Sequence, residues 1–218
     1  MLSVNAFSLS LDGKQLIDNL SFKIDSGQVL SIMGPSGIGK SSLLNFLSGS
    51  LTSHLSASGE IYLNDQALHL LPTQERQVGL LQQMPLLFPH MSIIENLLFA
   101  IPSRVKKSER QALAIKALAR LDIENKANAL PKELSGGQQA RVALLRTLLA
   151  EPKYLLLDEP FSKLDPALRR DVRAFVLDEI RQANIPALLV THDPEDAKAM
   201  EGKCLELKNV TSVSAVES

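Results

Sequence analysis

The stretch QVLSIMGPSGIGKS, residues 28–41, decides the fold of this chain. Gln28–Met33 is a short, nearly continuous apolar run, which is typical of a strand buried on both faces. It ends in Gly34–Ser41, which matches the pattern G-x-x-x-x-G-K-[ST] in full, and a helical pattern follows over Ser41–Ser50. A buried strand, a glycine loop and a helix in this order predict a parallel α/β sheet with an anion site at the loop.

The glycine loop predicts a nucleoside triphosphate site. Its glycines let backbone N–H groups turn inward around phosphate oxygens, Lys40 can reach the β- and γ-phosphates, and the Ser41 hydroxyl can ligate Mg²⁺. A glycine turn that holds a lysine by chance is the alternative, and the strand and helix around it disfavour that alternative. Nucleotide binding is therefore assigned to Gly34, Pro35, Ser36, Gly37, Ile38, Gly39, Lys40, Ser41 and Ser42.

Two further apolar runs, Tyr154–Leu157 and Ala187–Val190, also end in polar residues. The carboxyl ends of parallel strands meet at one edge of a sheet, where active sites of α/β proteins lie. After the first run, Asp158 suits a Mg²⁺ shell and Glu159 suits polarising an attacking water. After the second comes His192. A solvated acidic pair and a structural histidine are the alternatives, but the other three histidines, His54, His69 and His90, do not end buried strands.

Alternating apolar residues in Phe7–Leu11 and Leu20–Ile24 predict half-buried strands of an antiparallel sheet. Residues 51–58 are expected to form a small polar loop, and helices are expected over Arg104–Leu121 and Pro166–Ala183. The expected organisation is one domain, residues 1–218: an α/β core with an antiparallel part in 1–87 and 151–208, an inserted helical subdomain in 88–150, and a frayed tail in 209–218.

The stretch LSGGQQ, residues 134–139, opens a strongly helical run. Ser135 and Gln138 form a capping-box pattern, while Arg141 and Arg146 lie off the apolar face. A capped helix after a tight turn is the simple interpretation. Two bare glycines at a helix start also leave backbone N–H groups open to an anion.

Bulk composition is ordinary for a globular protein: 218 residues, 45% hydrophobic, 22% charged, net charge −1. The near-zero charge gives no reason to expect nucleic acid as a partner. The single cysteine, Cys204, excludes an internal disulfide and fits a reducing compartment. No apolar run approaches the roughly 20 residues that span a bilayer, and no secretory signal is visible, so we expect a cytosolic chain that meets a membrane only through a partner.

Taken together, these motifs resemble the ATP-binding subunit of ABC transporters, and the resemblance runs from the N-terminal strands to about residue 208. The residues that carry it are the phosphate loop Gly34–Ser41, Gln83 as the glutamine loop, LSGGQ at Leu134–Gln138, the acidic strand Tyr154–Pro160, the loop Ser162–Asp165, and His192. Kinases and GTPases with a phosphate loop lack LSGGQ.

The resemblance implies ATP and Mg²⁺ as ligands and a head-to-tail pair of copies. Ser135, Gly136, Gly137 and Gln138 of one copy would contact the γ-phosphate held by the other, with Asp165 near the nucleotide. Glu159 would orient the attacking water, His192 would contact the γ-phosphate, and Gln83 would sense Mg²⁺ and the water. Met84–Phe88 would receive a short helix of a transmembrane permease. Leu11 is the nearest match to the aromatic residue on which the family stacks adenine.

The segments LLFPHMSIIENL, residues 86–97, and DEPFSKLD, residues 158–165, resemble ATPases of importers that work with a solute-binding protein. The resemblance therefore implies a peripheral protein on the cytoplasmic face of the cell membrane, soluble when expressed alone. An exporter or lipoprotein-releasing ATPase is the main alternative. A soluble ABC ATPase of DNA repair or translation is a weaker one, since the chain carries neither a long coiled-coil insertion nor a second cassette. The transported solute and the role of Lys163 are left open by the sequence.

Overall fold

A computed structural model describes residues 1–208 and 212–216 of the chain. Its central sheet has the strand order β10-β9-β3-β8-β7-β6. The strands are β3 (Val29–Met33), β6 (Val78–Leu81), β7 (Tyr154–Asp158), β8 (Ala187–Val190), β9 (Lys203–Lys208) and β10 (Ser212–Val216). β3 and β6–β9 run parallel, and β10 pairs antiparallel with β9. The predicted parallel α/β sheet is confirmed.

A second, antiparallel sheet has the order β2-β1-β4-β5. Its strands are β1 (Leu2–Leu11), β2 (Lys14–Ile24), β4 (Leu55–Leu63) and β5 (Gln66–Ala67). The predicted loop 51–58 is thus too long: β4 begins at Leu55, because Leu55 and Ala57 face inward between exposed serines and pair with Leu11 and Leu9 of β1. Within residues 51–58 only Leu55 and Ala57 alternate with polar residues, and two apolar positions are too few to indicate a strand.

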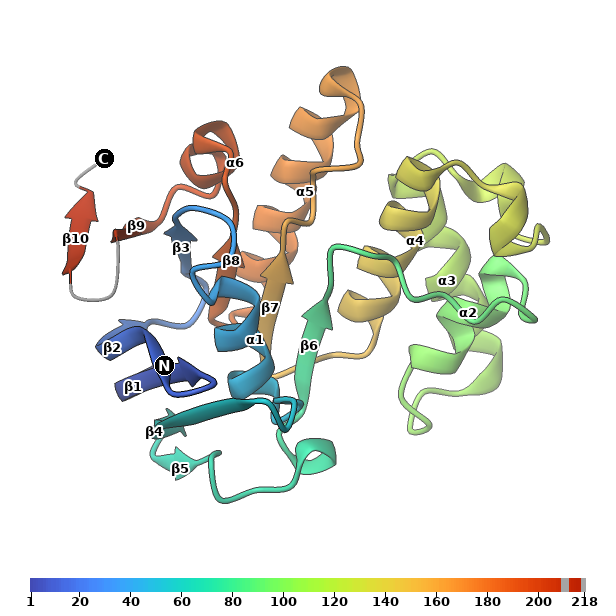
Figure 1. Ribbon diagram of the computed structural model, residues 1–218. Helices are drawn as coiled ribbons and strands as arrows, with labels where there is room; N and C mark the ends of the chain where they lie inside the picture. Colours follow the sequence, from blue (N-terminus) through green and yellow to red (C-terminus); the bar gives the residue numbers. More distant parts are fainter. Residues whose placement is uncertain (209–211, 217–218) are drawn as a thin grey trace.

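Helix α1 (Lys40–Ser48) lies between the two sheets (Figure 1). Leu43, Leu44 and Leu47 are at most 1% exposed and pack in one core cluster with both sheets. Helices α5 (Pro166–Ala183) and α6 (Pro194–Ala199) follow the strands β7 and β8. Alternate residues of β7 and β8 join two different core clusters, which confirms that both strands are buried on both faces.

The helices α2 (Ile93–Ala100), α3 (Lys107–Arg120) and α4 (Gly136–Leu149) form a lobe beyond β6 (Figure 1). Short 3₁₀ turns at Glu124–Lys126 and Pro131–Glu133 connect α3 to α4, and another lies at Thr73–Glu75. Arg141 differs from its prediction, since it is only 9% exposed and its guanidinium donates to the Leu121 carbonyl. Burial lowers the pKa of this guanidinium, and the carbonyl at the end of α3 stabilises its charge there.

Within the expected frayed tail, Ser212–Val216 instead form the edge strand β10, paired with β9. Residues 209–211 and 217–218 lie outside the described residues. Among the helices that the structure describes, none combines the length and apolarity that crossing a membrane requires.

Candidate active site

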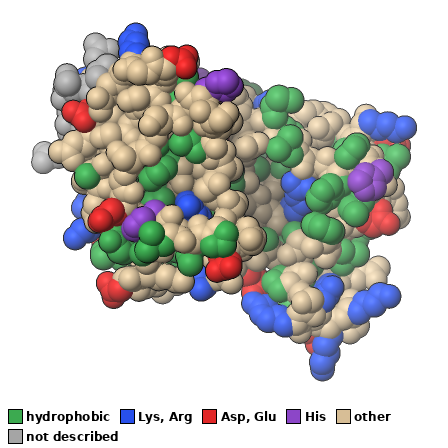
Figure 2. Space-filling view, turned by 60° about the horizontal axis from the view of Figure 1, so that its bottom comes forward, with side chains coloured by type: hydrophobic (Ala, Val, Ile, Leu, Met, Phe, Trp, Pro, Cys, Tyr) green, Lys and Arg blue, Asp and Glu red, His purple; other side chains and the backbone are tan. Residues whose placement is uncertain are grey.

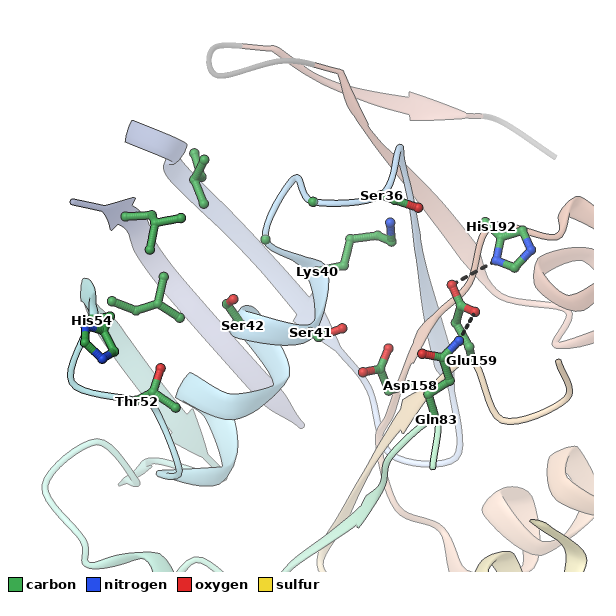
Figure 3. A pocket seen from close by; sticks show the side chains of 15 residues that line it. Ser36, Lys40, Ser41, Ser42, Thr52, His54, Gln83, Asp158, Glu159 and His192 are labelled. Carbon is green, nitrogen blue, oxygen red and sulfur yellow. Dashed lines mark hydrogen bonds and ion pairs between the residues drawn. The ribbon is translucent and has the colours of Figure 1, made fainter. Parts of the chain in front are cut away.

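A cleft of about 710 Å³ lies at the carboxyl ends of the parallel strands (Figure 3). It brings together predicted site residues from five separate segments of the sequence. Of the predicted site residues, those that line the cleft are Leu11, Ser36, Gly37, Gly39, Lys40, Ser41, Ser42, Gln83, Asp158, Glu159 and His192. A volume of this size is typical of a cofactor-sized ligand site.

The phosphate loop wraps around the side chain of Lys40, which is 8% exposed. Its ammonium donates hydrogen bonds to the carbonyl oxygens of Gly34, at 2.7 Å, and Pro35, at 2.9 Å. Burial lowers the pKa of this ammonium, and the carboxylates of Glu159 and Asp158 partly offset that effect. The positive charge of Lys40 therefore lies at the N-terminus of α1, where a bound anion would compensate it.

Gly39 cannot be replaced without strain. Its φ is +103°, and a Cβ built there would lie 2.6 Å from Cδ2 of Leu9. The left-handed turn that starts α1 so close to β1 therefore requires glycine. Three predicted site residues of the loop, Gly34, Pro35 and Ile38, are not among the described residues that line the cleft. Gly34 and Pro35 act from behind it, because their carbonyl oxygens accept hydrogen bonds from Lys40.

Ser41 and Asp158 face the same region of the cleft (Figure 3). Burial raises the pKa of the Asp158 carboxyl, and a hydrogen bond from Ser41 and the charge of Lys40 act in the opposite direction. A hydroxyl and a partly desolvated carboxylate are oxygen ligands of the kind that Mg²⁺ prefers. Within the described residues, no group of three or more His, Cys, Asp or Glu side chains is arranged to hold a metal ion.

Glu159 connects two other predicted residues. Gln83 Nε2 donates to one carboxylate oxygen at 3.1 Å, and His192 Nδ1 lies 2.8 Å from the other (Figure 3). The Glu159 side chain is 18% exposed, whereas that of His192 is 64% exposed. Glu159 also has a left-handed backbone, with φ of 47°, an uncommon conformation that turns the chain directly after β7. The arrangement holds one carboxylate at the end of β7, where it lines the cleft.

Residues that the sequence reasoning missed support the loop around His192. Arg173 forms ion pairs with Asp193 and with the buried Asp196, and Thr191 Oγ1 donates to Asp196 at 3.0 Å. Arg169 pairs with Asp193 at 2.9 Å and donates to the Leu164 carbonyl. The sequence does contain two arginines four residues apart on α5 and two aspartates shortly after His192. It does not show that these residues pair with each other, which only the three-dimensional structure reveals.

The LSGGQ segment does not reach this cleft. None of Ser135, Gly136, Gly137, Gln138 and Asp165 is among the described residues that line it. The predicted capping box is present, since Gln138 N donates to Ser135 Oγ at 3.3 Å and Ser135 N to Gln138 Oε1 at 2.9 Å. Asp165 caps α5 by accepting from Leu168 N at 3.0 Å. A Cβ at Gly136 would meet nothing within 4 Å, so the fold of one chain does not need glycine there.

Comparisons with known proteins place the chain in a family. A family model described as ABC transporter matches residues 17–162. The uncharacterized ABC transporter ATP-binding protein YnjD of Escherichia coli (strain K12) is 47% identical over 199 residues, which are 91% of this chain and 92% of YnjD. The spermidine/putrescine import ATP-binding protein PotA of Vibrio cholerae is 36% identical over 210 residues, 96% of this chain. This chain spans 55% of the length of PotA.

Solved structures give the same result. The dimeric post-hydrolysis state of the ATP-binding cassette MJ0796, bound to ADP and Pi, superposes with a TM-score of 0.84 at 27% identity and covers both chains fully. A second dimeric structure of MJ0796, a bacterial ABC transporter cassette, matches equally well, with a TM-score of 0.84.

Proposed function

Because this chain belongs to the ABC transporter family of ATP-binding proteins, and so is an ATP-hydrolysing transport subunit that uses ATP and Mg²⁺, we propose that it powers a solute importer. In this proposal two copies work together on a transmembrane permease at the cytoplasmic face of the cell membrane, supplied by a solute-binding protein. The observation that supports ATP hydrolysis is the contact of Gln83 and His192 with Glu159 at the edge of the cleft. The import ATPases that resemble the chain support the direction of transport.

We assign the chemical roles to residues as follows. Lys40 and the loop Gly34–Ser42 would bind the phosphates. Ser41, Asp158 and Gln83 would hold Mg²⁺, and a bound Mg²⁺ would supply charge that neutralises the phosphates. The carboxylate of Glu159 would accept a hydrogen bond from the attacking water and take up its proton while the water oxygen bonds to the γ-phosphorus. The bond from the γ-phosphorus to the β–γ bridging oxygen breaks in the same step, so that ADP and phosphate leave. His192, 2.8 Å from Glu159, contacts the γ-phosphate and keeps that carboxylate oriented.

A second copy completes the site. Ser135 and the backbone N–H groups of Gly136 and Gly137, at the positive end of α4, would bind the γ-phosphate held by Lys40 of the other copy. The open space around Gly136 supports this assignment, because a Cβ placed there would lie within 4 Å of no described atom beyond its chain neighbours and its own helix turn. Asp165 and Gln138 would lie at the same contact between copies.

The Gly136→Leu variant is expected to keep its fold and to lose the nucleotide-bound dimer. Leucine favours a helix over glycine by up to about 1 kcal/mol, and this position is open in the single chain. The added side chain would occupy the space into which the partner's γ-phosphate must come. The dimer is measured by light scattering in the presence of ATP, with Gly136→Leu combined with Glu159→Gln so that ATP is not hydrolysed. A dimer of unchanged affinity would contradict the contact between copies.

The permease is proposed to dock on three exposed apolar side chains, two in the loop between β6 and α2 and one on α2. Met84, Leu86 and Phe99 are 67%, 62% and 65% exposed, and Figure 2 shows apolar side chains gathered on the helical lobe. Arg146 on α4 donates to the Leu86 carbonyl at 2.5 Å and stacks over Phe88 at 5.1 Å from the ring centroid. A permease helix seated there would therefore contact the segment between Gln83 and the LSGGQ helix.

The double variant Met84→Ser, Leu86→Ser is expected to hydrolyse ATP at the basal rate of the isolated chain but to separate from the permease on purification. It removes apolar contact area without altering the cleft. The matched control is Leu70→Ser, which changes a leucine that is 76% exposed outside the patch. If both variants co-purify equally with the permease subunits, the docking surface is wrong.

Stimulation of ATP hydrolysis by a solute-loaded binding protein distinguishes an importer from an exporter.

A further inference from the structure

The cleft extends well beyond the phosphate loop. Thr52 and His54, in the loop between α1 and β4, lie at the end of the cleft away from Glu159 and His192, with Ser41 and Lys40 between (Figure 3). Leu11 at the end of β1, Leu16 on β2 and Leu55 at the start of β4 line the cleft as well. One cleft therefore has two chemically different ends, one charged and one largely apolar.

The apolar end of the cleft leaves aliphatic surface exposed in the part of the chain that the structure describes. Leu11 is 41% exposed, and Leu16 and Leu55 are half-buried. A hydrogen bond of 3.1 Å from Leu55 N to the Thr52 carbonyl closes the turn that carries His54. Exposed aliphatic side chains beside a turn that presents an imidazole suit a flat, aromatic part of a ligand.

His54 itself has no structural task that the described residues reveal. Its imidazole makes no hydrogen bond, ion pair or ring contact within residues 1–208, whereas Nδ1 of His69 is hydrogen-bonded to the backbone of Ile61 and His90 contacts the ring of Phe88. It is exposed, so the fold does not need it. An imidazole that lines a cleft without an internal partner is available to a ligand.

We propose that His54 is a specificity-determining residue for the base of the nucleotide. Its imidazole packs against the heterocycle, and Leu11 and Leu16 supply the apolar surface beneath the same base. The inference rests on the proposed ATP site, because the phosphates must be held by Lys40 for the base to reach this end. Every base has a flat face that can stack on an aromatic ring. The contact area is larger for the two fused rings of a purine, so we expect purine nucleotides to gain more binding free energy than pyrimidine nucleotides.

The test compares ATP with inorganic tripolyphosphate, which carries the phosphates and no base. In calorimetric titrations with Mg²⁺, His54→Ala is expected to weaken ATP binding about three- to tenfold and to leave tripolyphosphate binding unchanged. The preference for ATP over UTP should fall in the same variant, and His54→Phe should restore both. His90→Ala is the matched control, an exposed histidine away from the cleft, and should bind like the unmodified chain.

Equal ATP affinity in His54→Ala and the unmodified chain would overturn the inference. So would a parallel loss of tripolyphosphate affinity, which would mean that the substitution disturbs the phosphate end instead. The variant Lys40→Ala tests the proposed ATP site separately from the base contact of His54, since it should lose both ATP and tripolyphosphate binding. If Lys40→Ala loses both and His54→Ala loses neither, only the base contact is wrong. If Lys40→Ala still binds ATP normally, the nucleotide site itself is misplaced.

Discussion

The Glu159→Gln variant is expected to bind ATP as the unmodified chain does and to hydrolyse it at least about 100-fold more slowly. Glutamine has the same shape and can still form hydrogen bonds with Gln83 and His192, which contact the two carboxylate oxygens at 3.1 and 2.8 Å. It lacks the negative charge that draws the proton from the attacking water. The rate in a single turnover, measured with labelled ATP, gives the size of the loss.

The same variant should accumulate a dimer that holds two ATP molecules, because hydrolysis is the step that releases the closed state. Light scattering with ATP and Mg²⁺ measures this directly. Glu60→Gln is the control. It changes an exposed glutamate on β4, which belongs to the antiparallel sheet and not to the sheet of β7, and the variant should still hydrolyse ATP. Hydrolysis by Glu159→Gln at the normal rate would show that another group acts as the base.

The Lys40→Ala variant is expected to weaken ATP binding at least about 100-fold. The ammonium is only 8% exposed and points into the loop that it closes through the Gly34 and Pro35 carbonyls. In a site shielded from water its attraction to the β- and γ-phosphates is strong, since each charge-assisted hydrogen bond contributes about 1.5–3 kcal/mol. Equilibrium titration with ATP gives the dissociation constant.

The fold should survive this change, because both hydrogen bonds of Lys40 are made within its own loop. A melting temperature within a few degrees of the unmodified chain checks that expectation. Lys116→Ala, which removes an exposed lysine from α3, is the control and should bind ATP normally. An unchanged dissociation constant for Lys40→Ala would reject the phosphate-loop assignment for this chain.

Local chemistry determined much of this protein from the sequence alone. The glycine loop, the buried strands β7 and β8 and the helix α5, whose predicted bounds Pro166–Ala183 agree with the structure, depend on periodicity, caps and glycine conformations within a few residues. The ends of those strands therefore place Asp158, Glu159 and His192 at one sheet edge on sequence grounds alone.

Only the tertiary structure decided the contacts between distant segments. Gln83 meets Glu159 across 76 residues of sequence because β6 pairs with β7, and periodicity does not encode the order of strands. The burial of Arg141, the ion pair of Arg173 with Asp196, and the place of His54 in the same cleft as Leu11 likewise depend on packing between elements. Sequence patterns report which face of a segment is buried, whereas the identity of the partner that covers it is settled by the three-dimensional fold.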